Sequence, residues 1–263
     1  MSYKNNITGY REDLLINRSV IKHGNFALIE PDGIVKNVIP GFEKCVMTIL
    51  ASPKLGASFV DYLVEVEPGG KNIQGFGECG VEVFFYVFEG TINVWNEDEK
   101  AELTDGGYIF CPEGKKLYFE NKGEGTVKAF LYKRRYDRIE GHEAHTVIEN
   151  INNVPWVNYE GMEDVLVKDF LPSATNLGFD MNFHILLFKA GACHGYIETH
   201  VQEHGAYIYS GQGMYNLDNN WIPVKKGDYL FMGAYSPQAA YGIGRNEDFA
   251  YIYSKDCNRD VRL

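Results

Sequence analysis

The sequence predicts an all-β protein made of two tandem β-barrels of jelly-roll type. Short apolar segments of roughly five to eight residues alternate with turns rich in glycine and proline, which is typical of strands in sandwiches and barrels. No long segment with the helical period of 3.6 residues competes with them. The chain also repeats itself at one offset, and its 263 residues, 45% of them hydrophobic, suffice for two domains with separate cores.

The repeat appears when the chain is shifted by 121 residues against itself. Segment 106–110, Gly-Gly-Tyr-Ile-Phe, then falls on 227–231, Gly-Asp-Tyr-Leu-Phe, and 130–132, Phe-Leu-Tyr, falls on 251–253, Tyr-Ile-Tyr. The same offset pairs Gly70 with Gly191, Gly90 with Gly211, Gly106 with Gly227, and Ala129 with Ala250. One offset held over about 70 residues indicates two copies of one β-rich unit.

Individual strands follow from the apolar runs. The first copy is expected to have strands at 59–67, 83–88 and 92–95, and the second copy a β-rich run from Ala206 to Tyr209. Residues 136–165 lack strand alternation and are expected to connect the copies. We therefore expect an N-terminal barrel over 1–135, and a connector plus C-terminal barrel over 136–263.

Composition narrows the class of protein. A net charge of −11 and a pI near 5.1 favour a soluble protein and argue against a nucleic-acid partner, which needs clustered Lys and Arg. Neither a secretory signal nor an apolar run of about 18 residues is visible, so we expect a cytoplasmic protein without a membrane partner. Five scattered cysteines suit reduced thiols.

The segment 195–204 concentrates candidate metal ligands. Glu198, His200 and His204 share sequence parity, so on an extended segment their side chains face one side. Two imidazoles and a carboxylate can hold a divalent ion and leave positions open for water or substrate. The alternative is a solvent-exposed strand whose polar residues form no site. Cys193 breaks the parity, and we expect His184 and His194 to be core or surface histidines rather than support for the ligands.

The repeat supplies an internal control. Under the shift of 121 residues, the three candidates correspond to Gly77, Cys79 and Val83, which cannot form an equivalent metal set. The site is therefore expected in the second copy alone. The first barrel is expected to contribute packing, contacts between subunits or a wall of the pocket, and the Gly-His-Glu-Ala-His run at 141–145 to be a solvated loop.

These residues resemble the two motifs of the cupin superfamily, G-x5-H-x-H-x3-4-E-x6-G and G-x5-P-x-G-x2-H-x3-N. Glu198 stands at the first histidine of the first motif, His200 at the second, and His204 at the glutamate, with Gly211 closing it. In the second motif the first copy is the more faithful, but Leu117 occupies its ligand position. The second copy has Gly227, Gly233 and Tyr235 at the motif's Gly, Pro and Gly, and Gln238 at the ligand position.

The permuted set Glu, His, His and Gln resembles the bicupins of the (S)-ureidoglycine aminohydrolase family. The resemblance runs nearly end to end, including 6–13, 200–207 and 253–260. It implies Mn²⁺ as cofactor and hydrolysis of (S)-ureidoglycine, a small molecule, to (S)-ureidoglycolate and ammonia in allantoin and purine breakdown. Carried over by position, it implies Glu198, His200, His204 and Gln238 as metal ligands, and Tyr215, Tyr251 and Lys255 as substrate contacts.

Within this interpretation Glu198 and Lys255 are the expected catalytic residues, Lys255 by pairing with a substrate carboxylate or carbonyl and Glu198 by moving protons. A homo-oligomer is also expected, because bicupins commonly associate. Two other interpretations stay open at this point: a cupin enzyme of another type, such as an iron dioxygenase or a sugar-phosphate isomerase, and a non-enzymatic module that binds a small molecule.

Overall fold

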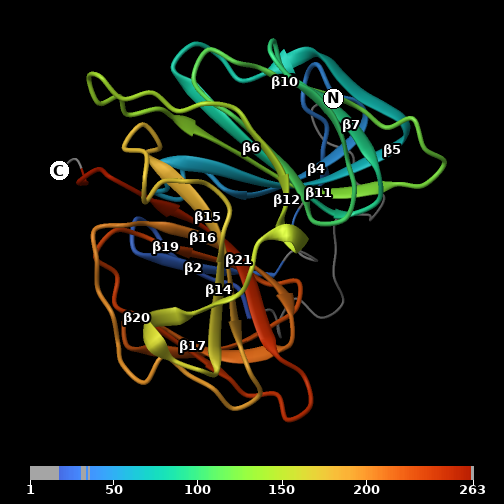
Figure 1. Cartoon of the computed structure of the whole chain (residues 1–263). Helices are drawn as coiled ribbons and strands as arrows, with labels where there is room; N and C mark the ends of the chain where they lie inside the picture. The colour runs from blue at the N-terminus through green and yellow to red at the C-terminus, as the bar shows by residue number, and fades with distance from the viewer. Residues whose placement is uncertain (1–17, 31–33, 35, 262–263) are drawn as a thin grey trace. The chain divides into compact units, whose positions relative to one another are not determined.

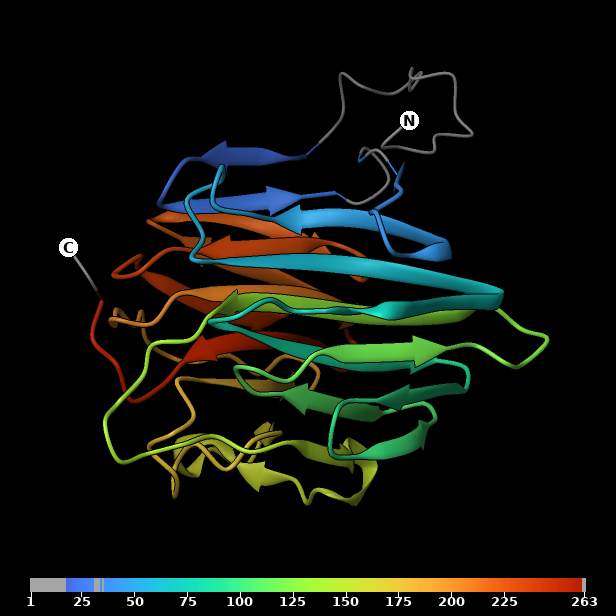
Figure 2. The ribbon, with the colours of Figure 1, turned by 90° about the horizontal axis from the view of Figure 1, so that it is seen from above.

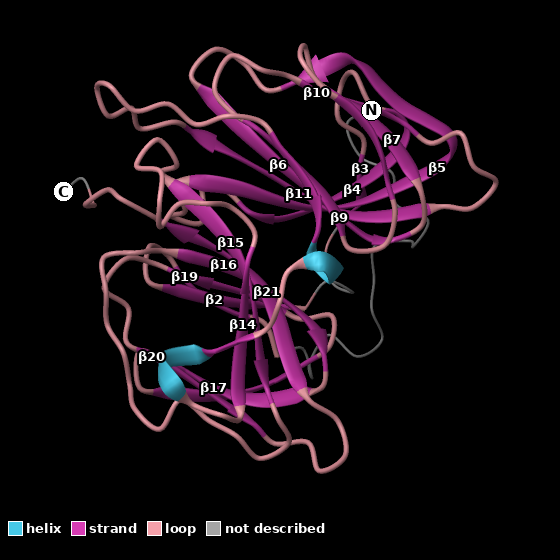
Figure 3. Ribbon diagram, viewed as in Figure 1, coloured by secondary structure: helices cyan, strands magenta, loops and turns pink. Residues whose placement is uncertain are grey.

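The computed structural model describes residues 18–30, 34 and 36–261, and Figures 1 and 3 show that these residues are dominated by β-strands. They divide into two compact units, and the fold agrees with the all-β, two-barrel prediction. Helical structure in the described residues consists of the 3-10 turns η3 (Ile151–Asn153) and η4 (Tyr159–Gly161). None of the described helices is long or apolar enough to cross a membrane.

The N-terminal unit is one ten-stranded antiparallel sheet that curls around an apolar core. The strand order is β12-β9-β6-β11-β5-β10-β7-β8, with β4 on β5 and β3 on β4. Its strands are β3 (Lys36–Asn37), β4 (Glu43–Ala51), β5 (Phe59–Phe76), β6 (Val81–Glu89), β7 (Ile92–Trp95), β8 (Lys100–Leu103), β9 (Gly107–Cys111), β10 (Leu117–Glu120), β11 (Val127–Arg135) and β12 (Val147–Asn150). Val83, Phe85, Leu117 and Phe119 are among the buried side chains that fill it.

The C-terminal unit has an eight-stranded sheet, β1-β2-β19-β16-β21-β15-β14-β13, and a three-stranded sheet, β18-β17-β20. Its strands are β1 (Val20–Lys22), β2 (Phe26–Ile29), β13 (Val157–Asn158), β14 (Val165–Asp169), β15 (Met181–Phe188), β16 (His204–Ser210), β17 (Gln212–Leu217), β18 (Asn220–Lys225), β19 (Tyr229–Met232), β20 (Gln238–Gly242) and β21 (Phe249–Asp256). Its core includes Tyr215, Tyr251 and Tyr253 beside aliphatic residues, so hydroxyl groups are buried there.

The offset of 121 residues reappears in the strands, and it reveals an exchange between the copies. Strand β2 lies 121 residues before β12, yet β2 pairs with β19 of the C-terminal unit while β12 pairs with β9 of the N-terminal unit. Figure 2 shows blue β1 and β2 beside orange strands of the C-terminal unit. Each exchanged strand covers an edge whose backbone groups would otherwise lack partners.

The exchange moves the domain boundary away from residue 135. Residues 18–30 and 54–57 group with the C-terminal unit, whereas 136–153 group with the N-terminal unit. The expected connector also contains short strands, β12 and β13, which sequence alternation did not reveal. Both are short enough that two or four residues cannot establish a period.

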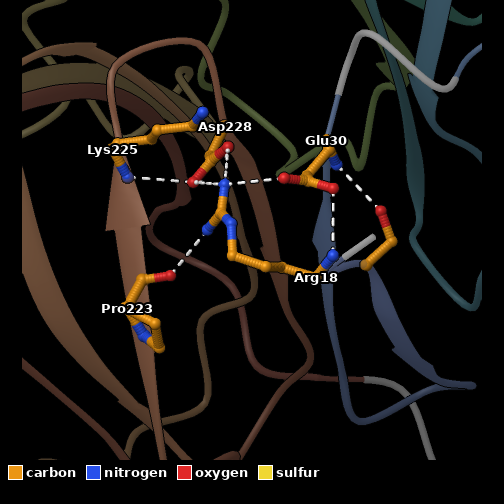
Figure 4. A network of polar contacts seen from close by, with 6 residues as sticks. Arg18, Glu30, Pro223, Lys225 and Asp228 are labelled. Atoms are coloured by element: carbon orange, nitrogen blue, oxygen red, sulfur yellow. Dashed lines mark hydrogen bonds and ion pairs between the residues drawn. The ribbon is translucent and has the colours of Figure 1, made fainter. Parts of the chain in front are cut away.

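An ionic network holds the beginning of the exchanged segment (Figure 4). The Arg18 guanidinium donates to both carboxylate oxygens of Asp228, at 2.8 and 2.9 Å, and pairs with Glu30 at 2.9 Å. It also donates to the Pro223 carbonyl at 2.8 Å, and Asp228 accepts from the Lys225 amide at 2.9 Å. Because Asp228 is buried, a paired guanidinium is needed to keep its charge there, and the network fixes where β1 enters the unit.

Candidate active site

A cavity in the C-terminal unit is lined by all seven residues that the resemblance implied. Its lining consists of Tyr159, Leu186, Glu198, His200, His204, Tyr215, Gln238, Tyr251, Tyr253 and Lys255. The predicted ligands enter from the loop 189–203 and the first residues of β16 and β20, and the predicted substrate contacts from β17 and β21. The sequence-based set therefore shares one space.

The two histidines present bare nitrogens to each other. His204 Nδ1 lies 2.8 Å from the Ser254 carbonyl and His200 Nδ1 lies 3.1 Å from the Gln202 carbonyl. A carbonyl only accepts, so each ring carries its proton on Nδ1 and leaves Nε2 with a lone pair. The two Nε2 atoms are 3.2 Å apart. Two lone pairs at this distance repel unless a proton or cation lies near both.

The burial of the two rings determines whether a proton or a metal cation is favoured between the two Nε2 atoms. The pKa of His204 is held well below its usual value by burial, and further by His200 and Lys255 nearby. The pKa of His200 is also lowered, first by burial and then by Lys255. Both rings are therefore neutral at neutral pH, the form in which imidazole binds a metal. The pair is thus suited to a metal cation rather than to a shared proton.

Gln238, the first residue of β20, completes this part of the cavity. Its Nε2 lies 2.8 Å from His200 Nε2, while its Oε1 is buried without a hydrogen-bond partner among the described residues. Half a turn of the amide would bring Oε1 to the histidine nitrogens, where it presents a lone pair beside theirs. An orphaned buried carbonyl oxygen beside two bare imidazole nitrogens is the donor chemistry that a borderline or hard divalent cation accepts.

Glu198 reaches the cavity differently from the way its parity suggested. Residues 189–203 form a loop rather than a strand, and Glu198 is held by an isolated backbone bridge with Gln238, with N–O distances of 2.9 Å both ways. Burial raises the pKa of its carboxyl, and Lys255 opposes the shift. No three His, Cys, Asp or Glu side chains among residues 18–30, 34 and 36–261 form a ready metal cluster, so the histidine pair is the preset part.

Strands β17 and β21 supply hydroxyl groups and a cation to the cavity. Tyr215 and Tyr251 are fully buried, and the Tyr215 hydroxyl donates to that of Tyr251 at 3.4 Å. Burial raises the pKa of both phenols, so they act as neutral hydrogen-bonding groups. The Lys255 ammonium forms no hydrogen bond or ion pair within the described part of the chain, and it is close enough to affect the pKa of Glu198 and both histidines. It is available for an anionic ligand.

Three lining residues were missed from the sequence. Tyr253 shares the parity of Tyr251 and Lys255 on β21, and that period of two could have identified it. Tyr159 comes from η4 in the expected connector, where no pattern marks it. Leu186 on β15 is an ordinary apolar core residue in the sequence.

The remaining candidates lie outside the cavity lining. The His184 side chain pairs with Asp169 and stacks on Tyr253, with ring centroids 5.1 Å apart. His194 is buried and packs edge-on against Phe188. Cys193 forms an isolated backbone bridge with Tyr241. His142 and His145 are exposed, and segment 6–13 lies outside the described residues.

Comparison with known proteins identifies the family of this chain. A "Cupin domain" family model matches residues 62–132. The (S)-ureidoglycine aminohydrolase of Escherichia coli K12 is 62% identical over 263 residues and covers 100% of both chains, and a probable (S)-ureidoglycine aminohydrolase of rice is 31% identical, covering 92% of this chain and 76% of its own. The crystal structure titled protein Ylba from E. coli matches with a TM-score of 0.84 and 57% identity, over 97% of this chain and 100% of that one. The chain belongs to the (S)-ureidoglycine aminohydrolase family of cupin proteins.

Proposed function

We propose that this chain uses a divalent cation, manganese, to convert (S)-ureidoglycine and water to (S)-ureidoglycolate and ammonia. The aminohydrolase reaction follows from the family. The observation that supports a metal here is the pair of unprotonated Nε2 atoms of His200 and His204. They lie 3.2 Å apart in a cavity that keeps both rings neutral. Glu198, His200, His204 and Gln238 would hold the ion.

The donor types favour manganese or ferrous iron over structural zinc. Two imidazoles, a carboxylate and an amide oxygen are borderline or hard donors, and no thiolate belongs to the described cavity lining. A bound divalent ion supplies Lewis acidity and lowers the pKa of water.

The protein's own residues account for binding and orientation. (S)-Ureidoglycine carries a carboxylate, an amine and a ureido group on one carbon. The Lys255 ammonium pairs with the carboxylate or a carbonyl, and the hydroxyls of Tyr215 and Tyr251 can donate to or accept from the ureido group. The apolar walls, Leu186 and the Tyr253 ring, limit water in the cavity. Holding the reacting groups in one well-aligned geometry can lower the barrier by about 7–11 kcal/mol.

Hydrolysis also needs a group that holds a proton. The attacking water gives up a proton as its oxygen bonds to the substrate carbon, and the departing nitrogen takes one up as the C–N bond breaks. Glu198 lines the cavity, and a carboxylate oxygen that the metal leaves free would be able to take up and return this proton. We assign this transfer to Glu198, with the charge of Lys255 beside it.

The setting of the reaction is also part of the proposal. A cytoplasmic enzyme of allantoin-derived purine breakdown is proposed, and the relatives' name fits that pathway. A homo-oligomer is proposed from the habit of bicupins to associate, and gel filtration with light scattering tests it.

Ammonia release from (S)-ureidoglycine, generated in place from allantoate by its amidohydrolase, tests the function. Chelator-treated protein is compared with and without added Mn²⁺, and with ferrous iron while oxygen uptake is followed. The proposal expects release well above the spontaneous rate, restored by manganese without oxygen consumption. Unchanged release under every metal contradicts it, and iron-dependent oxygen uptake supports a dioxygenase instead.

A further inference from the structure

Two segments that are separate in the sequence, the loop 189–203 and the turn η4, lie beside the cavity in the C-terminal unit. The loop 189–203 carries Glu198 and His200, and the turn η4 carries Tyr159, which lines the same cavity. The loop is tied to β20 by backbone hydrogen bonds at Gly191, Ala192, His194 and Glu198, and the Tyr235 amide, just before β20, donates to the His200 carbonyl at 2.8 Å. Such a loop needs side-chain contacts to hold its ligands in place.

One tyrosine from each segment packs on the buried ring of His194. Its Nδ1 accepts from the Ala240 amide at 3.2 Å, two residues beyond Gln238. The Tyr196 ring stacks on it at 5.7 Å between centroids, and the Tyr159 ring packs on it at 5.8 Å. Burial lowers the pKa of His194 to about 4, so the ring is neutral and serves as a packing surface.

A hydrogen bond joins the two segments above this ring. The Tyr196 hydroxyl donates to Glu160 Oε2 at 2.6 Å, the short distance of a charge-assisted bond. Tyr196 lies two residues before Glu198, and Glu160 directly follows Tyr159.

The backbone at Glu160 supports a specific role for this contact. Glu160 has φ of 49°, in the left-handed region that non-glycine residues seldom occupy. Such a conformation costs on the order of 1 kcal/mol and persists where surrounding contacts hold it. Glu160 is exposed and Tyr196 is 40% exposed, so general burial does not explain the arrangement. Position 75, the counterpart of Tyr196 in the first copy, is a glycine, so the contact is absent from that copy.

We propose that the Tyr196–Glu160 hydrogen bond is a latch that positions the Glu198-bearing loop over the cavity and thereby sets the metal affinity of the site. Glu160 and Tyr196 are positioning residues: they act through Glu198 and Tyr159. The inference rests on the proposed manganese site. It adds two exposed residues, outside the cavity lining, to those that determine how well the site is formed.

The test measures the Kd for Mn²⁺ by titration calorimetry or by the electron paramagnetic resonance signal of free Mn²⁺. Removing a partner that orients ligands typically weakens metal binding about 10- to 100-fold, and the lower end, about 10-fold, is expected for Glu160→Ala and Tyr196→Phe. Tyr196→Phe keeps the stack on His194. The double variant should be no weaker than either single variant, because both remove the same bond. Glu160→Gln, which keeps an acceptor oxygen, should recover most of the affinity.

Glu163→Ala is the matched control, since Glu163 is exposed three residues further on and uses its backbone carbonyl to accept from Lys189. Its Kd should equal that of the wild type, and the Tm of all metal-free variants should stay close to the wild-type Tm. Wild-type affinity in Glu160→Ala, or additive losses in the double variant, would overturn the latch. Failure of the wild type itself to bind Mn²⁺ would instead overturn the proposed metal site.

Discussion

Strand β5 of the N-terminal unit runs unbroken for 18 residues, Phe59–Phe76, whereas its counterpart in the C-terminal unit ends after eight, Met181–Phe188. The second half of β5 pairs with β10, and Leu117 lies opposite Phe76. In the C-terminal unit the same stretch is the loop 189–203, and Gln238 meets it at the bridge to Glu198. One copy closes its barrel here with apolar residues, and the other leaves a polar opening.

The difference shows how a duplicated barrel separates stability from chemistry. Val83 and Leu117, the counterparts of His204 and Gln238, are 1% and 0% exposed and belong to the apolar core of their unit. The C-terminal unit gives up that packing and buries imidazole, amide and phenol groups. His204 is stabilised by a hydrogen bond to the Ser254 carbonyl, and the Tyr215 hydroxyl by one to the Tyr251 hydroxyl. The cupin family model matches 62–132, in the copy without the ligands.

The largest expected effect comes from giving the C-terminal unit the residue of its counterpart. His204→Val removes one of the two preset nitrogens, and ammonia release should fall more than about 100-fold, because loss of outer-shell partners alone costs 10- to 100-fold. The measurement is the rate of ammonia release at saturating Mn²⁺, with circular dichroism to verify folding. Activity within tenfold of wild type would contradict the conclusion that the C-terminal unit differs from its counterpart by holding the metal site.

The complementary variant, Leu117→Ala, changes the N-terminal unit instead. Deleting a fully buried leucine side chain should lower the free energy of unfolding by about 2–5 kcal/mol, as measured by urea denaturation, because a cavity is left in the core. The Kd for Mn²⁺ of the folded protein should stay within about twofold of wild type. A large loss of manganese affinity would mean that the N-terminal core takes part in the site.

Lys255→Met tests the cavity's available cation. Its counterpart in the first copy is Arg134, so Lys255→Arg is the matched variant that keeps the charge. A hydrogen bond to a charged group contributes about 1.5–3 kcal/mol, so Lys255→Met should lower kcat/KM about 10- to 100-fold. Lys255→Arg should lose less. If KM and kcat of Lys255→Met match the wild type, Lys255 has no role in substrate binding.

The smallest effect concerns pH and His194, whose counterpart is the exposed Ile73. Burial lowers the pKa of His194 from 6.5 to about 4, so the unfolded chain binds a proton that the folded chain does not. This contribution to stability is present above pH 6.5 and is lost as pH falls toward 4. At pH 5.5 the loss is about 1 kcal/mol. Metal-free His194→Phe should therefore lose less unfolding free energy between pH 7.5 and 5.5 than the wild type; equal losses would contradict the assignment.

Much of the fold was predictable, because glycine turns and strand alternation are local signals and the offset of 121 residues survives in the strands. The exchange of β2 and β12 was not, since a four-residue strand pairs equally well with either barrel on local grounds. Parity brought Glu198, His200 and His204 together correctly, but for the wrong reason: the first two lie on a loop whose shape depends on its bridge to Gln238. Tyr159 was missed because contact across the chain, not periodicity, places it in the cavity.

Manganese stoichiometry tests the central claim most directly. Elemental analysis of metal-loaded, desalted protein should find one Mn²⁺ per chain in the wild type and in Leu117→Ala, and background levels in His204→Val. Two ions per chain, or one ion retained by His204→Val, would contradict the assignment of the metal to the C-terminal barrel alone.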